Sequence, residues 1–90
     1  MAGPLDGVKI IELGQMIAVP GATYILATQG ADIIKVENTT GGDDLRMYGS
    51  RKNGMSGWFA NANAGKRSIG IDLMSEEGKQ VLWRLLKRSD

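Results

Sequence analysis

The chain has 90 residues, of which 42% are hydrophobic and 23% charged, and its formal net charge is +1. This length allows one domain at most, and so small a net charge gives no bulk electrostatic reason to bind nucleic acid or an acidic membrane surface. Because the sequence has no cysteine and no histidine, it excludes disulfides, thiolate nucleophiles, imidazole bases and Cys- or His-ligated metals within these residues.

Residues 4–37 predict a parallel βαβ unit. Two apolar, β-branched runs, 8–13 and 32–37, enclose residues 14–31, which have helical character. This separation is long enough for a crossover helix and too long for a hairpin. Pro20 suits the first turn of the helix, and Gly30 is placed to be its left-handed C-cap. We expect the two strands to lie side by side and to run in the same direction.

Residues 38–64 predict a long loop with a short helical turn near Asp44–Tyr48. Loops of this length inside a compact domain are usually functional or mobile. We expect Trp58 and Phe59 to pin the far end of the loop to the core, because large exposed aromatic side chains are costly.

Residues 67–89 predict a third strand followed by a helix. Ile69, Ile71 and Leu73 alternate with small or polar residues, as in a strand. Ser75 is then placed to be an N-cap, before two glutamates at the positive end of the helix dipole. An α/β protein should continue with a further strand, and few helices are available to cover this sheet. We therefore expect these residues to be the front portion of a longer architecture.

Neither of two nucleotide-binding motifs is complete in this sequence. The loop from Gly14 to Gly21 lies where open α/β sheets bind ligands, but it lacks the three closely spaced glycines of a dinucleotide fingerprint. Glu37 is then interpreted as a solvated charge at the end of a strand. The run at residues 60–67 half resembles a P-loop, yet a strand follows it where a helix should. Lys66 and Arg67 could meet a phosphate as point charges or could be solvated loop cations.

Two further features of the sequence have ordinary structural explanations. The Asp43-Asp44 pair is taken as the start of a helical turn, neutralised by nearby Arg46. The N-terminus lacks the regions of a signal peptide, and no apolar run approaches the roughly 20 residues of a membrane span, so a cytoplasmic protein is expected. Spacing and composition thus give a parallel α/β unit with a candidate ligand loop, but they name no ligand.

The order of motifs resembles the N-terminal portion of the class III CoA-transferases, the CaiB/BaiF family. Four landmarks carry the resemblance over nearly all of the chain: PLDG at 4–7, A-x-P at 18–20, GADIIKVE at 30–37 followed by GGD at 41–43 and Arg46, and NAGKRSI at 63–69 leading through Asp72-Leu73 to Glu77-Gly78. The resemblance implies an α/β fold with a Rossmann-like parallel sheet and flanking helices, as the N-terminal part of a larger two-domain fold. Residues 1–90 would be the N-terminal portion of its large domain.

The resemblance also implies a function. Relatives of this kind are much longer, interlock as homodimers, and either move CoA between carboxylic acids or racemise α-methylacyl-CoA thioesters. In the transferases an aspartate attacks the thioester, which is covalent carboxylate catalysis. That aspartate lies beyond position 90, so no catalytic residue is assigned here and the 90 residues alone are expected to be inactive. No metal ligand is assigned either. The alternatives are the racemase and a non-catalytic CoA-binding module.

What can be carried over is part of the site for coenzyme A, which would enter as a substrate thioester. The loop after the first strand and the segment after the third would contribute, so the implied CoA-binding residues are Gln15, Met16, Ile17, Ala18, Asn38, Ile71, Asp72, Leu73 and Met74. Ile17 stands where formyl-CoA transferases carry glutamine, which argues against that substrate class. Asn38 replaces a phosphate-binding arginine and Met74 a common lysine. Either CoA affinity is lower for this reason, or Lys66, Arg67 or Arg46 compensates.

Overall fold

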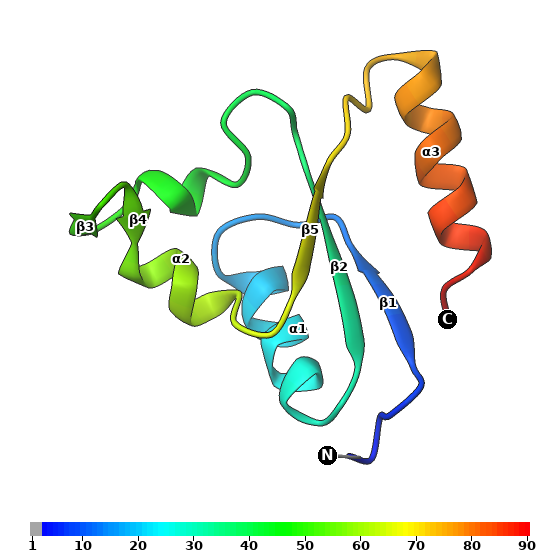
Figure 1. Ribbon diagram of the computed structural model, residues 1–90, viewed down its shortest axis with the longest axis horizontal. Coiled ribbons are helices and arrows are strands. Elements are labelled where there is room, and N and C mark those ends of the chain that lie inside the picture. The colour runs from blue at the N-terminus through cyan, green and yellow to red at the C-terminus, as the bar shows by residue number, and fades with distance from the viewer. Residues whose placement is uncertain (1–2) are drawn as a thin grey trace.

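The computed structural model describes residues 3–90 and shows an α/β fold built on a parallel sheet (Figure 1). Its elements in chain order are β1 (Lys9–Glu12), α1 (Ala18–Thr28), β2 (Asp32–Glu37), the 3₁₀ helix η1 (Asp44–Met47), β3 (Arg51–Lys52), β4 (Met55–Ser56), α2 (Gly57–Ala62), β5 (Arg67–Gly70) and α3 (Glu76–Lys87). The main sheet is three-stranded with the order β1-β2-β5, and β3 and β4 form a separate hairpin.

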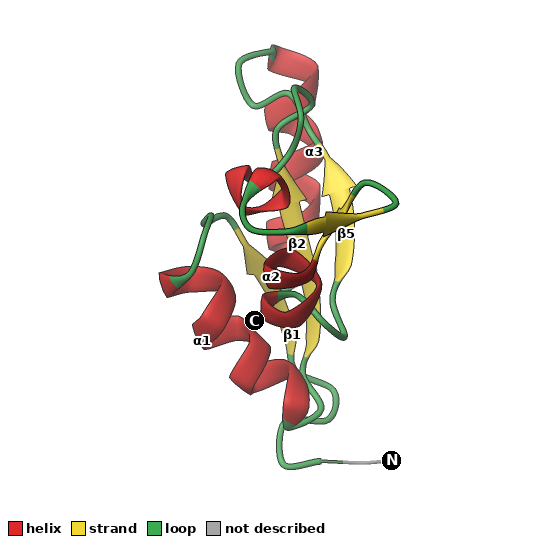
Figure 2. Ribbon diagram, turned by 90° about the vertical axis from the view of Figure 1, so that its left-hand side faces the viewer, coloured by secondary structure: helices red, strands yellow, loops and turns green. Residues whose placement is uncertain are grey.

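The βαβ unit predicted from the sequence is confirmed. β1 and β2 run parallel, with Ile10 opposite Ile33 and Glu12 opposite Lys35. β5 then pairs in parallel with the other edge of β2. Side chains alternate between the faces of a strand, so these two pairs share one face. That face is covered by α1 (Figure 2), and Ile33 is fully buried there.

The end of α1 is set by Gly30, as predicted. Gly30 has φ +100°, and its N–H donates to the carbonyl of Ala27 at 3.0 Å. The N–H of Ala31 donates to the carbonyl of Leu26 at 3.2 Å. This pair of bonds is the Schellman arrangement, which satisfies the last helix carbonyls and turns the chain directly into β2.

The segment 38–64 is more ordered than the predicted loop. The helical turn near Asp44 is confirmed as η1, but the expectation of loop elsewhere is wrong over the β3–β4 hairpin and α2. The hairpin turns at Asn53-Gly54, whose φ angles of 53° and 80° are those of a type I′ turn. α2 begins at Gly57, where the Ser56 hydroxyl accepts the N–H of Phe59.

The two aromatic residues of α2 behave differently. Phe59 is buried, and the guanidinium of Arg46 lies 3.8 Å from its ring centre. The prediction that Phe59 pins this segment is therefore confirmed. Trp58 is 61% exposed, so the same prediction is wrong for that residue. The Trp58 ring instead lies against Gly49, where an added Cβ atom would meet it at 2.9 Å.

After β5 the chain makes a tight turn into α3. The strand ends at Gly70, before the predicted Leu73. The Ser75 hydroxyl accepts the N–H of Gly78 at 2.9 Å and caps α3, as predicted. α3 lies beyond the β1 edge of the sheet (Figure 1), and at its end the N–H of Asp90 donates to the carbonyl of Lys9 at 2.8 Å. No helix formed within residues 3–90 is both long and apolar enough to cross a membrane.

Gly30 and Gly21 should respond oppositely to replacement by alanine. In Gly30→Ala the new Cβ would be held at a left-handed φ, 3.2 to 3.3 Å from backbone atoms of Gly3 and Asp6, and we expect a loss of about 1–2 kcal/mol. Gly21 is inside α1 with no atom within 4 Å of its Cβ position. Gly21→Ala should therefore gain about 0.5–1 kcal/mol. Urea unfolding measures both, and a stabilising Gly30→Ala would contradict the cap.

Candidate functional site

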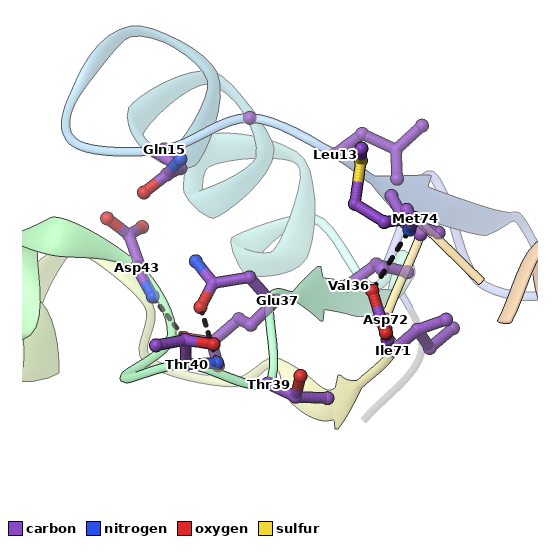
Figure 3. A pocket seen from close by; sticks show the side chains of 13 residues that line it. Leu13, Gln15, Val36, Glu37, Thr39, Thr40, Asp43, Ile71, Asp72 and Met74 are labelled. Atoms are coloured by element: carbon purple, nitrogen blue, oxygen red, sulfur yellow. Dashed lines mark hydrogen bonds between the residues drawn. The ribbon is translucent and has the colours of Figure 1, made fainter.

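A cleft of about 350 Å³ opens at the carboxyl ends of the three parallel strands (Figure 3). This is the edge at which open α/β sheets bind ligands. The lining residues all follow, or end, β1, β2 or β5: Leu13, Gly14, Gln15, Val36, Glu37, Asn38, Thr39, Thr40, Asp43, Ile71, Asp72, Leu73 and Met74. The strand order therefore brings together three segments that are distant in the sequence.

The structure brings most of the predicted site residues together and leaves the others aside. Those that line the cleft are Gln15, Asn38, Ile71, Asp72, Leu73 and Met74. Met16, Ile17 and Ala18 are outside the lining, on the way from Gln15 into the first turn of α1. Sequence reasoning did not single out Leu13, Val36, Thr39 and Thr40, although each lies at or just beyond the carboxyl end of a predicted strand.

One side of the cleft is apolar. Val36 and Ile71 are buried at its base, and Leu13 and Leu73 are partly exposed above them. Met74 is 91% exposed at the rim. In Figure 3, Leu13 and Met74 lie together at one end of the cleft, whereas Gln15 and Asp43 lie at the other. The cleft thus offers a ligand an apolar surface with polar groups at one end.

The side chain of Asn38 holds the polar loop that follows β2. The Asn38 Oδ1 atom accepts the N–H groups of Thr40 at 2.8 Å and Gly42 at 3.2 Å, and its Nδ2 donates to the Gly42 carbonyl at 2.9 Å. Since an amide nitrogen carries two hydrogens, Asn38 keeps one donor for a ligand. Asp72 acts similarly after β5, where its Oδ1 accepts the Met74 N–H at 3.0 Å.

A buried cluster of charges lies beneath the cleft. Lys35 projects from the middle of β2, and its Nζ lies 2.7 Å from Glu12 Oε2, 2.8 Å from Asp43 Oδ2 and 3.3 Å from the Gly14 carbonyl oxygen. Lys35, Glu12 and Asp43 are each 1% exposed. Asp43 Oδ2 meets Lys35 as an ion pair and makes no directed hydrogen bond within residues 3–90. One ammonium group therefore joins β1 to the loop that follows β2.

The second oxygen of Glu12 is equally occupied. Lys66 Nζ lies 2.8 Å from Glu12 Oε1 and also donates to the Pro20 carbonyl at 2.9 Å and to Asn63 Oδ1 at 2.8 Å. The Thr23 hydroxyl of α1 donates to the same Glu12 oxygen at 2.5 Å. Glu12 thus ties β1 to α1 and to the segment before β5.

The remaining oxygen of Asp43 organises the backbone of the cleft. Its Oδ1 accepts the N–H of Leu45 at 2.9 Å, which caps η1, and the N–H of Met16 at 3.0 Å. The prediction that Asp43 starts a helical turn is confirmed, but its cationic partner is Lys35 and not Arg46. Met16 has φ +67°, a left-handed conformation that non-glycine residues adopt rarely.

Glu37 forms a second ion pair nearby. Arg46 donates from Nε to Glu37 Oε1 and from Nη2 to Glu37 Oε2, both at 2.8 Å. The Ser68 hydroxyl and the Asp43 N–H also donate to this carboxylate. The interpretation of Glu37 as a solvated charge is therefore wrong, since the residue is buried and connects β2, β5 and η1.

These contacts set the protonation states of the buried carboxylates and of Lys66. The bidentate Arg46 guanidinium holds the pKa of Glu37 at about 2, well below its ordinary value. Burial alone would raise the pKa of Glu12 and of Asp43, but their lysine partners and other donors outweigh it, so both pKa values are lowered. Burial lowers the pKa of Lys66, and Glu12 partly offsets this. All three carboxylates are ionised at neutral pH.

The cations expected to compensate at a phosphate site are engaged elsewhere. Lys66 is bound to Glu12, and Arg46 to Glu37. Arg67 lies on the opposite face of the sheet, 2.7 Å from Asp32. Within residues 3–90 no lysine or arginine lines the cleft. The contacts in the cleft therefore give no support to compensation by Lys66, Arg67 or Arg46, and the alternative of a lower CoA affinity stays a prediction.

The chain is similar to known proteins over nearly its whole length. The model of CoA-transferase family III matches residues 5–90. A succinate–glutarate CoA-transferase from Agrobacterium fabrum is 42% identical over an alignment 94 residues long, which covers 97% of this chain and 24% of that protein. The alpha subunit of a succinyl-CoA–L-malate CoA-transferase from Chloroflexus aurantiacus is 34% identical, over 97% of this chain and 21% of its own length.

Solved structures give the same result. A crystal structure of a CAIB/BAIF family protein from Brucella suis superposes with a TM-score of 0.91 at 39% sequence identity, covering 100% of this chain and 25% of that one. The chain thus spans about a quarter of the length of the relatives it matches. The Rossmann-like α/β fold and its place as the N-terminal part of a longer family architecture are confirmed.

Acid should weaken the protein through Glu37. Its pKa is lowered from 4.5 to about 2 on folding, so its contribution is fully present above pH 4.5 and is lost as the pH falls towards 2. Near neutral pH we expect Glu37→Gln to lower the free energy of unfolding by roughly 2 kcal/mol. The difference from the wild-type protein should shrink steadily below pH 4.5 in urea titrations.

Asp32→Asn is the matched control, because it breaks a more exposed ion pair, with Arg67, on the other face. Its effect near neutral pH should stay below about 1 kcal/mol. A Glu37→Gln deficit that does not change between pH 7 and pH 2 would contradict the assignment.

Proposed function

The chain belongs to CoA-transferase family III, and from that membership we propose that it supplies one wall of the coenzyme A site in an enzyme that moves CoA between carboxylic acids. In this proposal residues 1–90 are the N-terminal portion of the large domain, and the full-length protein is a homodimer acting on acyl-CoA and carboxylic acid substrates. The observation that carries the proposal is the cleft at the carboxyl ends of β1, β2 and β5.

The shape and lining of the cleft support this function. CoA combines an adenine ring with a long, largely neutral pantetheine arm, and both can bury apolar area against Val36, Ile71 and Leu73. Gln15 can bind the ligand at the polar end, because its Oε1 accepts the Asp44 N–H at 3.1 Å while its NH₂ group keeps its donors. Asn38 contributes its remaining amide hydrogen at the mouth.

The residues outside the lining fit a ligand longer than the cleft. Met16, Ile17 and Ala18 continue from Gln15 to the start of α1. A pantetheine arm that leaves the cleft past Gln15 would reach them next. Asp72, Leu73 and Met74 would border the opposite end.

No residue of the chain is proposed to be the nucleophile. Glu12, Asp43 and Glu37 are each bound by a lysine or arginine, and their lowered pKa values mark weakly basic oxygens. Attack on a thioester needs a carboxylate that is free to approach it. We place the aspartate that forms the covalent intermediate outside these residues, and we propose no metal.

The direct test is CoA binding by the 90-residue chain. In titrations followed by amide NMR, we expect saturable shifts at Gln15, Asn38 and Leu73, and no acyl transfer between added thioesters and acids. Leu73→Asp should abolish the shifts, because it brings a second carboxylate beside Asp72 into the apolar side of the cleft. Robust turnover would place the nucleophile inside the chain, and the absence of shifts at millimolar CoA would contradict the binding role.

A single added cation should reveal the missing phosphate contacts. Met74 is 91% exposed, so Met74→Lys adds charge at the rim with little structural cost. We expect CoA affinity to rise by about 0.5–1 kcal/mol at low salt, as for other exposed charge pairs. The gain should vanish at about 1 M salt, where the Debye length is about 3 Å.

Two comparisons make this result specific. Adenosine has no phosphate, so its affinity should be unchanged by Met74→Lys. Met55→Lys adds the same charge to the β3–β4 hairpin, away from the cleft. An equal gain from Met55→Lys, or a gain for adenosine, would show that the effect is not a phosphate contact at the rim.

A further inference from the structure

Two of the three segments that line the cleft are called its two walls here, and they follow different strands. One is the segment after β1, which carries Gly14 and Gln15, and the other is the loop after β2, which ends at Asp43. Short segments of this kind have few apolar contacts of their own and would move independently if nothing joined them. The joining contacts are therefore what fixes the width of the cleft.

Lys35 reaches both walls from below. Its ammonium group binds Glu12 at the end of β1 and the Gly14 carbonyl on one side, and Asp43 on the other. The ammonium donates hydrogen bonds to Glu12 and to the Gly14 carbonyl, and Asp43 Oδ2 lies 2.8 Å from it as an ion pair. Because Lys35 is 1% exposed, water competes little for these contacts.

Asp43 carries the connection up to the ligand-facing backbone. Its Oδ1 accepts the N–H of Met16 at 3.0 Å, a bond that joins the loop after β2 to the segment after β1. Next to it, the Asp44 N–H donates to Gln15 Oε1 at 3.1 Å. The left-handed Met16 conformation, with φ +67°, is disfavoured for an unbranched residue unless a contact holds it. Asp43 supplies that contact.

We propose that Lys35 and Asp43 are positioning residues, which lock the two walls together and hold Gln15 in place for the adenosine or pantetheine part of the ligand. This inference rests on the proposed CoA site. The cluster balances its charges, with Glu12 and Asp43 against Lys35 and Lys66. Cutting one contact leaves a buried charge without its partner, so both walls are released together. With the cluster intact, the cleft is preformed before a ligand arrives.

The variant that tests this is Asp43→Asn, which keeps the size of the side chain and an oxygen for the Met16 N–H but removes the charge that faces Lys35. We expect the Met16 amide proton to shift upfield and to exchange faster with solvent, while the amide of Ile33 in β2 does not change. CoA affinity should fall by about tenfold or more. Lys35→Gln cuts the same contact from the other side, and it should shift both readouts in the same direction if Asp43→Asn fails to fold cooperatively.

Two controls separate positioning from simple loss of stability. Gly30→Ala destabilises the end of α1 away from the cleft, and Asp32→Asn breaks an ion pair on the opposite face. Both should leave CoA affinity and the Met16 amide unchanged. An unaltered Met16 amide in Asp43→Asn, or an equal loss of CoA affinity in Gly30→Ala, would overturn the inference.

The Met16 readout needs no ligand. If the wild-type protein fails to bind CoA, the proposed function fails. The coupling of the two walls is then decided by the amide alone: a freed Met16 amide in Asp43→Asn supports it, and an unchanged one refutes it.

Discussion

The structure depends on one unusual placement: a lysine in the middle strand of a small parallel sheet, pointing under the cleft instead of into solvent. Lys35 lies between two ionised carboxylates, and all three groups are almost completely buried. Burying charges costs free energy that their mutual attraction only partly returns, so such a cluster is weak evidence for stability. Its contribution is geometric, since it allows one arrangement of β1, α1 and the loop after β2 and disfavours others.

The local signals of the sequence were enough for the frame of the fold. Strand-length apolar runs with a helix between them, closed by Gly30, predicted the βαβ unit, and Ser75 predicted the start of α3. The β3–β4 hairpin was missed although Asn53-Gly54 is a strong turn pair, because the flanking strands have only two residues each and show no alternation. α2 was missed because its six residues are too few for a helical period to be recognised.

The interior of the site was less predictable. The rule that ligands bind at the carboxyl ends of parallel strands indicated the loops that line the cleft. The same rule does not say that Glu12 and Lys35, inside two apolar runs, share a face and pair with each other. That follows from the strand register, in which Glu12 is opposite Lys35, and register is a tertiary property. A pair of opposite charges at inward positions of neighbouring buried strands was the available signal.

The same reasoning explains why Lys66 and Arg67, two possible phosphate contacts in the sequence, lie outside the lining of the cleft. Lys66 and Arg67 are adjacent in sequence, and adjacent residues at a strand point to opposite faces. Lys66 therefore meets Glu12 on the α1 face, and Arg67 meets Asp32 on the other, so neither reaches the cleft at the strand ends. Of these two basic residues, Lys66 instead helps to build the charge cluster beneath the cleft. A CoA site in this chain would then draw its affinity from apolar contact and neutral hydrogen bonds, and its binding here should depend little on salt.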